Sequence, residues 1–102
     1  MGAAARMPAK ARAAAEAQAL EQLPNIGPSI AADLRRIGVQ HPADLARRDA
    51  LELYQALQRA TGRRQDPCVL DTFMAATDFM RGAPPRRWWA YTAERKARFG
   101  IR

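Results

Sequence analysis

Apolar residues recur at helical spacing in a segment that follows a short turn. Ile30, Leu34 and Ile37 succeed one another at steps of four and three, the pattern of a helix buried along one side. This pattern predicts a helix over residues 28–37. Before the turn, residues 9–22 are rich in alanine, which has the highest helix propensity, and they predict a first helix. The turn therefore joins two expected helices.

Further segments carry start signals of helices. Asp49 and Glu52 have the spacing of a helix cap, and Asp66 precedes a proline that suits the first helical position. No segment alternates polar and apolar residues in the manner of a strand. The further helices are expected at residues 42–47, 49–60 and 67–81. The sequence therefore predicts an all-α fold, a compact bundle of about five helices.

The turn between the first two helices has a composition that suits anion binding. Asn25 and Gly27 are residue types that adopt positive φ at low cost, so the chain can reverse within a few residues. Pro28 fits the first turn of the next helix, because its missing N–H costs nothing there. The amides of Ser29 and Ile30 have no acceptor inside the helix, and the positive end of its dipole lies beside them. A phosphate is a natural partner for such amides.

The same residues resemble the helix-hairpin-helix motif of DNA-repair and replication proteins. The resemblance covers the segment LPNIGPSIAADL at residues 23–34 and continues through residues 38–45. Asn25 is a departure, because the motif has a glycine at that position. The resemblance implies one hairpin, at residues 20–45, within a SAM-like architecture.

The motif implies two sets of backbone contacts. Its amides contact successive phosphate oxygens of one DNA strand without reading bases. The matching amides are those of Gly27, Ser29 and Ile30, with Asn25 as a weaker fourth. In some members of the motif, carbonyls facing that phosphate hold a monovalent cation. The matching carbonyls are those of Glu21, Leu23 and Ile26. The alternative is a turn that joins two helices and binds no ligand.

Two further segments resemble a family of small bacterial proteins, the pathogenicity-locus or mitomycin resistance proteins. In that family the hairpin is followed by an Asp-Pro-Cys-Val-Leu segment and by a Trp-Trp pair. This chain has them at residues 66–70 and 88–89, so the resemblance covers residues 20–91. It implies a bacterial protein with a role in DNA repair or damage tolerance.

Positive charge is concentrated toward the C-terminus of the 102-residue chain, whose formal net charge is +7. Residues 63–102 carry nine basic and four acidic side chains, whereas residues 21–62 carry five of each. Attraction to a polyanion such as DNA is therefore expected mainly from the C-terminal third. The alternative is that the fifteen arginines and two lysines reflect a GC-rich genome.

Arginine pairs flank the expected phosphate track on the second helix, on the third helix and before the tryptophans. They are Arg35, Arg36, Arg47, Arg48, Arg86 and Arg87. Trp88 and Trp89 follow the last pair, and such a mixture can stack on bases and neutralise phosphates. Alternatively, at least one tryptophan docks the C-terminal segment onto the bundle. Further basic candidates in that segment are Arg95, Lys96 and Arg98.

The remaining composition predicts location and domain organisation. Cys68 is the single cysteine, which excludes an internal disulfide and a multi-cysteine metal site, and no cofactor is expected. The chain shows neither the apolar core of a secretory signal nor the roughly 20 apolar residues of a membrane span. We therefore expect a cytoplasmic protein with no membrane partner. Its expected parts are a flexible end at residues 1–8, a helical domain at 9–91 and a basic tail at 92–102.

Three function classes remain open, of which a non-enzymatic, sequence-independent DNA-binding module is favoured. The alternative is a protein-interaction or self-association module, such as a homodimer, because a neutral hairpin and a Trp pair suit it equally. The third class is a DNA-repair glycosylase or lyase. Asp49 lies at about the distance from the loop at which glycosylases with this hairpin carry a catalytic Asp. However, roughly 80 folded residues cannot enclose a flipped base, and Lys10 and Lys96 fall in expected end segments. We therefore expect no enzyme.

Overall fold

The chain folds into helices joined by short loops, and the computed structural model describes residues 9–102. This part of the chain contains four α-helices, four 3-10 helices and no strand, which confirms the all-α prediction. In chain order the elements are η2 (Ala14–Glu16), η3 (Leu20–Gln22), α1 (Pro28–Arg36), η4 (Pro42–Arg47), α2 (Ala50–Thr61), α3 (Pro67–Met80), η5 (Trp88–Tyr91) and α4 (Thr92–Phe99). The expected flexible end at residues 1–8 lies outside the described residues. Among the helices described, none has the length and apolar character that a membrane crossing requires.

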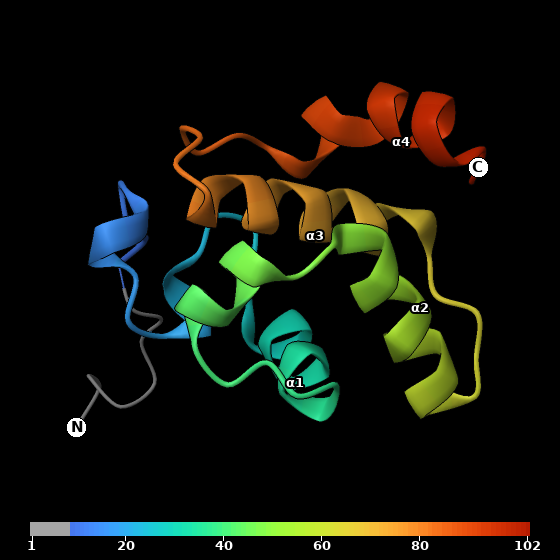
Figure 1. Cartoon of the computed structure of the whole chain (residues 1–102), viewed down its shortest axis with the longest axis horizontal. Coiled ribbons are helices and arrows are strands. Elements are labelled where there is room, and N and C mark those ends of the chain that lie inside the picture. Colours follow the sequence, from blue (N-terminus) through green and yellow to red (C-terminus); the bar gives the residue numbers. More distant parts are fainter. Residues whose placement is uncertain (1–8) are drawn as a thin grey trace.

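Helix α3 forms the centre of the fold. Residues 70–77 are all buried, and Figure 1 shows α3 as a middle layer between other helices. Segments η5 and α4 pack along one side of it, and η4 and α2 pack on the other. A helix at the surface of a domain is ordinarily buried along one side only. The burial extends further because neighbours cover α3 from two sides, as is typical of a helix that is apolar nearly all round.

The helix starts expected at the two aspartates are confirmed. The Asp49 carboxylate accepts a hydrogen bond of 3.1 Å from the backbone N–H of Glu52, at the start of α2. The Asp66 carboxylate accepts one of 3.0 Å from the N–H of Cys68, at the start of α3. Helix α2 ends at Gly62, which has a left-handed φ of 67°. Such caps satisfy backbone groups at helix ends, so these boundaries could be read from local sequence.

The alanine-rich helix predicted over residues 9–22 is wrong, because that segment contains only η2 and η3. The N–H of Ala11 donates to the carbonyl of Gln22 at 2.8 Å, so the segment folds back on itself. A helix of this length is marginal in water unless it buries an apolar face. Only Ala11 and Leu20 are buried in this segment. The fold-back brings Lys10 next to the turn that precedes α1.

The expected basic tail at residues 92–102 contains α4, which a buried ion pair holds against α3. Arg95 Nε lies 2.7 Å from Asp71 Oδ1, and the two side chains are 6% and 0% exposed. The Thr92 hydroxyl donates to the other Asp71 oxygen at 2.8 Å, and the Arg95 guanidinium donates to the Ile101 carbonyl at 2.6 Å. Arg95 therefore stabilises the fold and is not available to contact phosphate.

Tyr91, rather than either tryptophan, enters the core from η5. Tyr91 is 2% exposed, whereas Trp89 is 58% exposed and Trp88 is partly buried. The two tryptophan rings pack edge to face, with their centroids 5.5 Å apart. The C-terminal segment is therefore docked by Tyr91 and by the ion pair of α4, which leaves Trp89 at the surface.

Candidate nucleic-acid interface

Residues 23–27, called the 23–27 turn below, join η3 to α1. The N–H of Ile26 donates to the carbonyl of Leu23 at 3.2 Å. Asn25 has a φ of 68°, in the left-handed region that its residue type predicted. Gly27 has φ −96° and ψ −175°, so the expectation of a positive φ there is wrong. A Cβ atom on Gly27 would meet no atom within 4 Å. The protein's own conformation and packing therefore do not require glycine at this position, where the surface is left open.

The start of α1 leaves several backbone amides without a partner. The first hydrogen bond of the helix runs from the N–H of Ala31 to the carbonyl of Gly27, at 2.9 Å. Among residues 9–102, the amides of Asn25, Gly27, Ser29 and Ile30 have no acceptor. Ser29 is exposed, and the other three residues are partly exposed. The turn thus offers unpaired donors at the positive end of a nine-residue helix, an arrangement that favours an anion.

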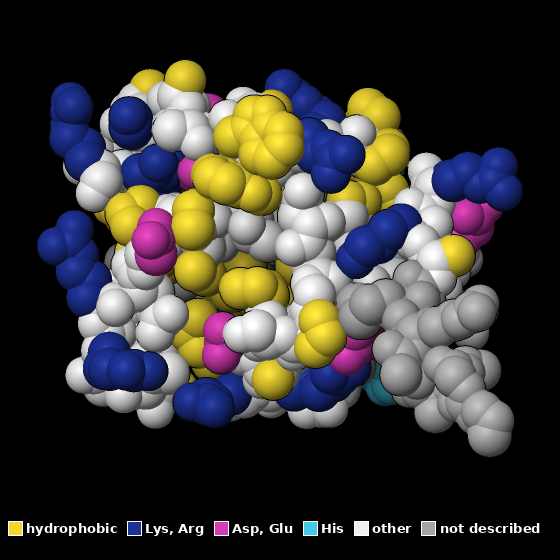
Figure 2. All heavy atoms as spheres, turned by 180° about the vertical axis from the view of Figure 1, so that it is seen from behind, with side chains coloured by type: hydrophobic (Ala, Val, Ile, Leu, Met, Phe, Trp, Pro, Cys, Tyr) yellow, Lys and Arg dark blue, Asp and Glu magenta, His cyan; other side chains and the backbone are white. Residues whose placement is uncertain are grey.

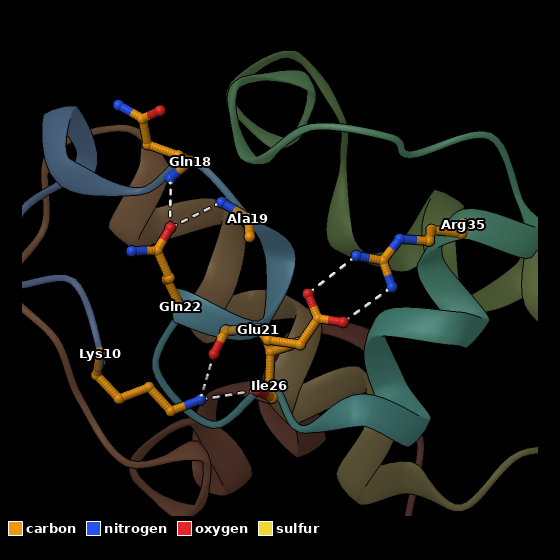
Figure 3. Close-up of polar contacts among 7 residues, drawn as sticks. All are labelled: Lys10, Gln18, Ala19, Glu21, Gln22, Ile26 and Arg35. Atoms are coloured by element: carbon orange, nitrogen blue, oxygen red, sulfur yellow. Dashed lines mark hydrogen bonds and ion pairs between the residues drawn. The ribbon is translucent and has the colours of Figure 1, made fainter. Parts of the chain in front are cut away.

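The carbonyls of the 23–27 turn and of η3 converge on a lysine. Lys10 Nζ donates to the carbonyl oxygens of Glu21, Leu23 and Ile26 at 2.9, 3.0 and 2.7 Å. Figure 3 shows the Lys10 side chain reaching from the N-terminal segment to the carbonyls of Glu21 and Ile26. One nitrogen can donate three hydrogen bonds only as an ammonium. The three carbonyls at which the sequence resemblance implied a monovalent cation therefore already face a positive charge.

Sequence reasoning missed Lys10 because it assigned residues 9–22 to a helix and Lys10 to an end segment. The available signal was composition, since Lys10 is one of two lysines in a chain with fifteen arginines. A compact ammonium with three donors suits three converging oxygens, whereas the planar guanidinium of arginine does not. Partial burial lowers the pKa of the Lys10 ammonium, and the Glu21 carboxylate opposes this effect.

Two of the arginines expected to contact phosphate are engaged in ion pairs. Arg35 makes two hydrogen bonds of 2.9 Å with the Glu21 carboxylate, which join α1 to η3 (Figure 3). These bonds hold the pKa of Glu21 below its usual value. Arg48 makes two bonds of 2.8 Å with Glu52. The charges of Arg35 and Arg48 are therefore largely balanced inside the protein.

Arg36 and Arg47 are exposed and form no ion pair within the described part of the chain. Figure 2 shows one face of the molecule with hydrophobic side chains in its middle and Lys and Arg side chains distributed around them. Positive charge is not gathered into a single patch on this face. Charge alone therefore does not mark out a binding site on this face.

The structure brings the arginine pair before the tryptophans to the 23–27 turn. Asn25 Nδ2 donates to the carbonyl of Arg86 at 2.7 Å, although the two residues are 61 positions apart. A shallow groove of about 410 Å³ lies between the segments. Its lining includes Lys10, Arg12, Pro24, Asn25, Arg86 and Arg87. Asn25, the departure from the glycine of the motif, thus anchors the predicted contacts Arg86 and Arg87 beside the turn.

Asp49 and Cys68 are side chains of types that enzymes use in catalysis. The Asp49 carboxylate caps α2. Burial, together with the neighbouring Asp66, raises the pKa of the Cys68 thiol, which disfavours the reactive thiolate. Within residues 9–102 there is no group of three or more His, Cys, Asp or Glu side chains that could hold a metal ion. The unpaired amides and the basic groove are features that suit an anionic ligand.

Comparisons with known proteins give two matches. Residues 13–97 match the family described as "Pathogenicity locus". The mitomycin resistance protein McrB of Streptomyces lavendulae is 49% identical to this chain over 77 residues, which are 76% of this chain and 73% of that protein. No solved structure matches the chain significantly.

Proposed function

This chain belongs to the pathogenicity-locus family, and on that premise we propose that it is a non-enzymatic module that binds the DNA backbone through a helix-hairpin-helix turn. The observation that carries the proposal is the set of unpaired amides at Gly27, Ser29 and Ile30. Each can donate to a phosphate oxygen, and none has a competing acceptor in the described part of the chain. The name of the S. lavendulae relative supports a role for this binding in tolerance of DNA-damaging drugs.

The backbone amides donate to phosphate oxygens and do not contact base edges, so the proposed contacts carry no sequence information. The exposed arginines beside the turn, Arg86 and Arg87, add charge neutralisation to these hydrogen bonds. Arg36 and Arg47 add further exposed positive charge on neighbouring helices. We therefore expect binding that falls steeply as salt rises and that differs little between unrelated sequences.

Fluorescence anisotropy with two unrelated labelled duplexes, each at two salt concentrations, tests this function. We expect equal dissociation constants for the two duplexes at each salt concentration and a strong weakening at the higher one. Affinity that does not depend on salt, or a clear preference for one duplex, would contradict the proposal.

An incubation with duplexes that contain an abasic site or uracil tests for catalysis. It is expected to release no product, and product release that is lost in Asp49→Asn would establish an enzyme instead.

The Arg86→Ala and Arg87→Ala double variant is expected to bind duplex DNA more weakly and with a shallower salt dependence. If both arginines neutralise phosphates, the slope of log K against log salt decreases by about 2. The slope is measured by anisotropy over a series of salt concentrations. The control is the Arg63→Ala and Arg64→Ala double variant, which removes the same charge from exposed residues at the end of α2. Equal slopes in the two double variants would argue against a specific role for the groove.

A second candidate function, self-association or binding of another protein, is favoured by one observation. Trp89 is 58% exposed, and an exposed tryptophan is a frequent anchor of protein interfaces. Light scattering coupled to size-exclusion chromatography separates the two functions. A stable dimer that Trp89→Ser dissociates, with no shift of DNA, would support this alternative and would contradict the first proposal.

A further inference from the structure

Lys10 contacts a peptide unit of the 23–27 turn whose carbonyl is bonded inside the protein and whose amide is unpaired. Its ammonium lies 2.7 Å from the carbonyl oxygen of Ile26, and the next amide in the chain is the unpaired N–H of Gly27. The peptide between Ile26 and Gly27 is trans, so its carbonyl and its N–H point in opposite directions. A bond that holds the carbonyl on Lys10 therefore turns the N–H of Gly27 away from Lys10.

The other two contacts fix the position of the ammonium. The carbonyl oxygens of Glu21 and Leu23 lie 2.9 and 3.0 Å from Lys10 Nζ. Figure 3 shows how the lysine and the carboxylate of Glu21 lie on different sides of η3, with the carboxylate turned to Arg35. The backbone N–H of Ala11, the next residue, is bonded to the carbonyl of Gln22 at 2.8 Å. Lys10 is thus held at η3 through its backbone neighbour, and at both η3 and the turn through its ammonium.

We propose that the Lys10 ammonium is a built-in cation of the turn, which positions the Gly27 amide for phosphate and takes the place of a dissolved monovalent ion. Three converging carbonyl oxygens repel one another unless a positive charge lies between them. An ammonium has the charge of a potassium ion and a similar size, and it is delivered by the chain itself. Lys10 precedes residues 13–97, so the ammonium lies outside the segment that matches the family, whereas the three carbonyls lie inside it.

Two consequences follow for the wild-type protein and for a variant that lacks the ammonium. The stability of the wild type does not depend on which monovalent cation is in solution. Lys10→Ala leaves three oxygens and a vacant space, so it acquires a site for potassium or ammonium ions. A site that binds an ion only in the folded state stabilises that state in proportion to the logarithm of ion concentration.

The test measures thermal unfolding in chlorides of potassium, ammonium and tetramethylammonium at equal ionic strength, with tetramethylammonium as the ion too large for the site. Wild type is expected to unfold at the same temperature in all three salts. Lys10→Ala is expected to unfold about 5–10 °C lower than wild type in tetramethylammonium chloride and to recover at least half of that loss in the other two. Lys96→Ala, which removes the other lysine at an exposed position of α4, is expected to behave as wild type.

Several outcomes would overturn the proposal. They are a Lys10→Ala variant equally stable in all three salts, a variant unfolded in all three, and a wild type that potassium stabilises. The Lys10→Arg variant keeps the charge but cannot place three donors at one point, so it is expected to lose stability without gaining potassium dependence.

The positioning role of Lys10 rests on the proposed function, and a DNA arm of the same experiment separates the two. Lys10→Ala is expected to lose about tenfold in affinity for duplex in tetramethylammonium chloride and to regain it in potassium chloride. If the stability of Lys10→Ala depends on potassium but the wild type does not bind DNA, the built-in cation is retained and the function is refuted. DNA binding by Lys10→Ala that is the same in both salts would retain the function and refute the positioning role.

Discussion

Replacing Arg95 by Met lowers the free energy of unfolding by about 3–5 kcal/mol, because it leaves a buried carboxylate without its cation. Asp71 is 0% exposed, and its oxygens accept hydrogen bonds of 2.7 Å from Arg95 and 2.8 Å from Thr92. A hydroxyl alone does not compensate a buried negative charge. The loss is a large share of the roughly 5–15 kcal/mol that stabilises a domain. Urea unfolding followed by circular dichroism measures it.

The matched control for Arg95→Met is Arg98→Met on the same helix. Arg98 pairs with Glu94 at 2.8 Å, but the two side chains are 55% and 45% exposed. Exposed pairs contribute at most about 1 kcal/mol, so Arg98→Met is expected to have a small effect. The double variant Asp71→Leu with Arg95→Met removes both charges and is expected to recover much of the stability. Equal losses for Arg95→Met and Arg98→Met would contradict the role assigned to the buried pair.

Gly27→Asp is expected to lower the affinity for duplex DNA by about ten- to a hundredfold while leaving the protein at least as stable. Gly27 is the N-cap residue of α1, and its φ of −96° and ψ of −175° are accessible to aspartate. A Cβ there meets no atom within 4 Å. The new carboxylate can accept from the amides of Ser29 and Ile30, as N-cap aspartates do, which stabilises helices by about 1 kcal/mol. The same carboxylate then occupies the place proposed for phosphate and repels it.

Two controls separate the effect of geometry from the effect of charge at this position. Gln55→Glu adds the same charge at an exposed position of α2 and is expected to change affinity only slightly. Gly27→Ala adds a methyl group without charge, so its loss of affinity is expected to lie between those of the other two variants. Anisotropy and thermal unfolding are measured for all three. A Gly27→Asp variant that binds as well as Gln55→Glu would show that phosphate does not reach this amide.

Local signals in the sequence predicted much of the fold. The caps at Asp49 and Asp66 and the proline that starts α1 depend on neighbours within three residues, and all are confirmed. The left-handed conformation of Asn25 could be predicted for the same reason, because it follows from the residue type. Helix propensity alone misled at residues 9–22, where no apolar face was available to stabilise an α-helix.

The contacts that complete the candidate site join residues distant in the chain, which periodicity and propensity do not detect. Lys10 reaches the carbonyl of Ile26 across 16 positions, and Asn25 holds Arg86 across 61. A lysine that donates to backbone carbonyls leaves no pattern in the sequence, since any residue supplies a carbonyl. The turn itself could therefore be predicted from sequence. The contact of Lys10 with its carbonyls and the position of Arg86 beside it could be found only in the structure.

The central claim is tested most directly by an NMR titration of the ¹⁵N-labelled protein with unlabelled random-sequence duplex. The amide signals of Gly27, Ser29 and Ile30 are expected to move to lower field and to saturate at one dissociation constant. The amides of Gly62 and Gly100 donate inside the protein, to Gln58 and Lys96, and are expected to stay in place. Duplex that binds while the amides of Gly27, Ser29 and Ile30 remain unmoved, or duplex that does not bind at all, would contradict the account.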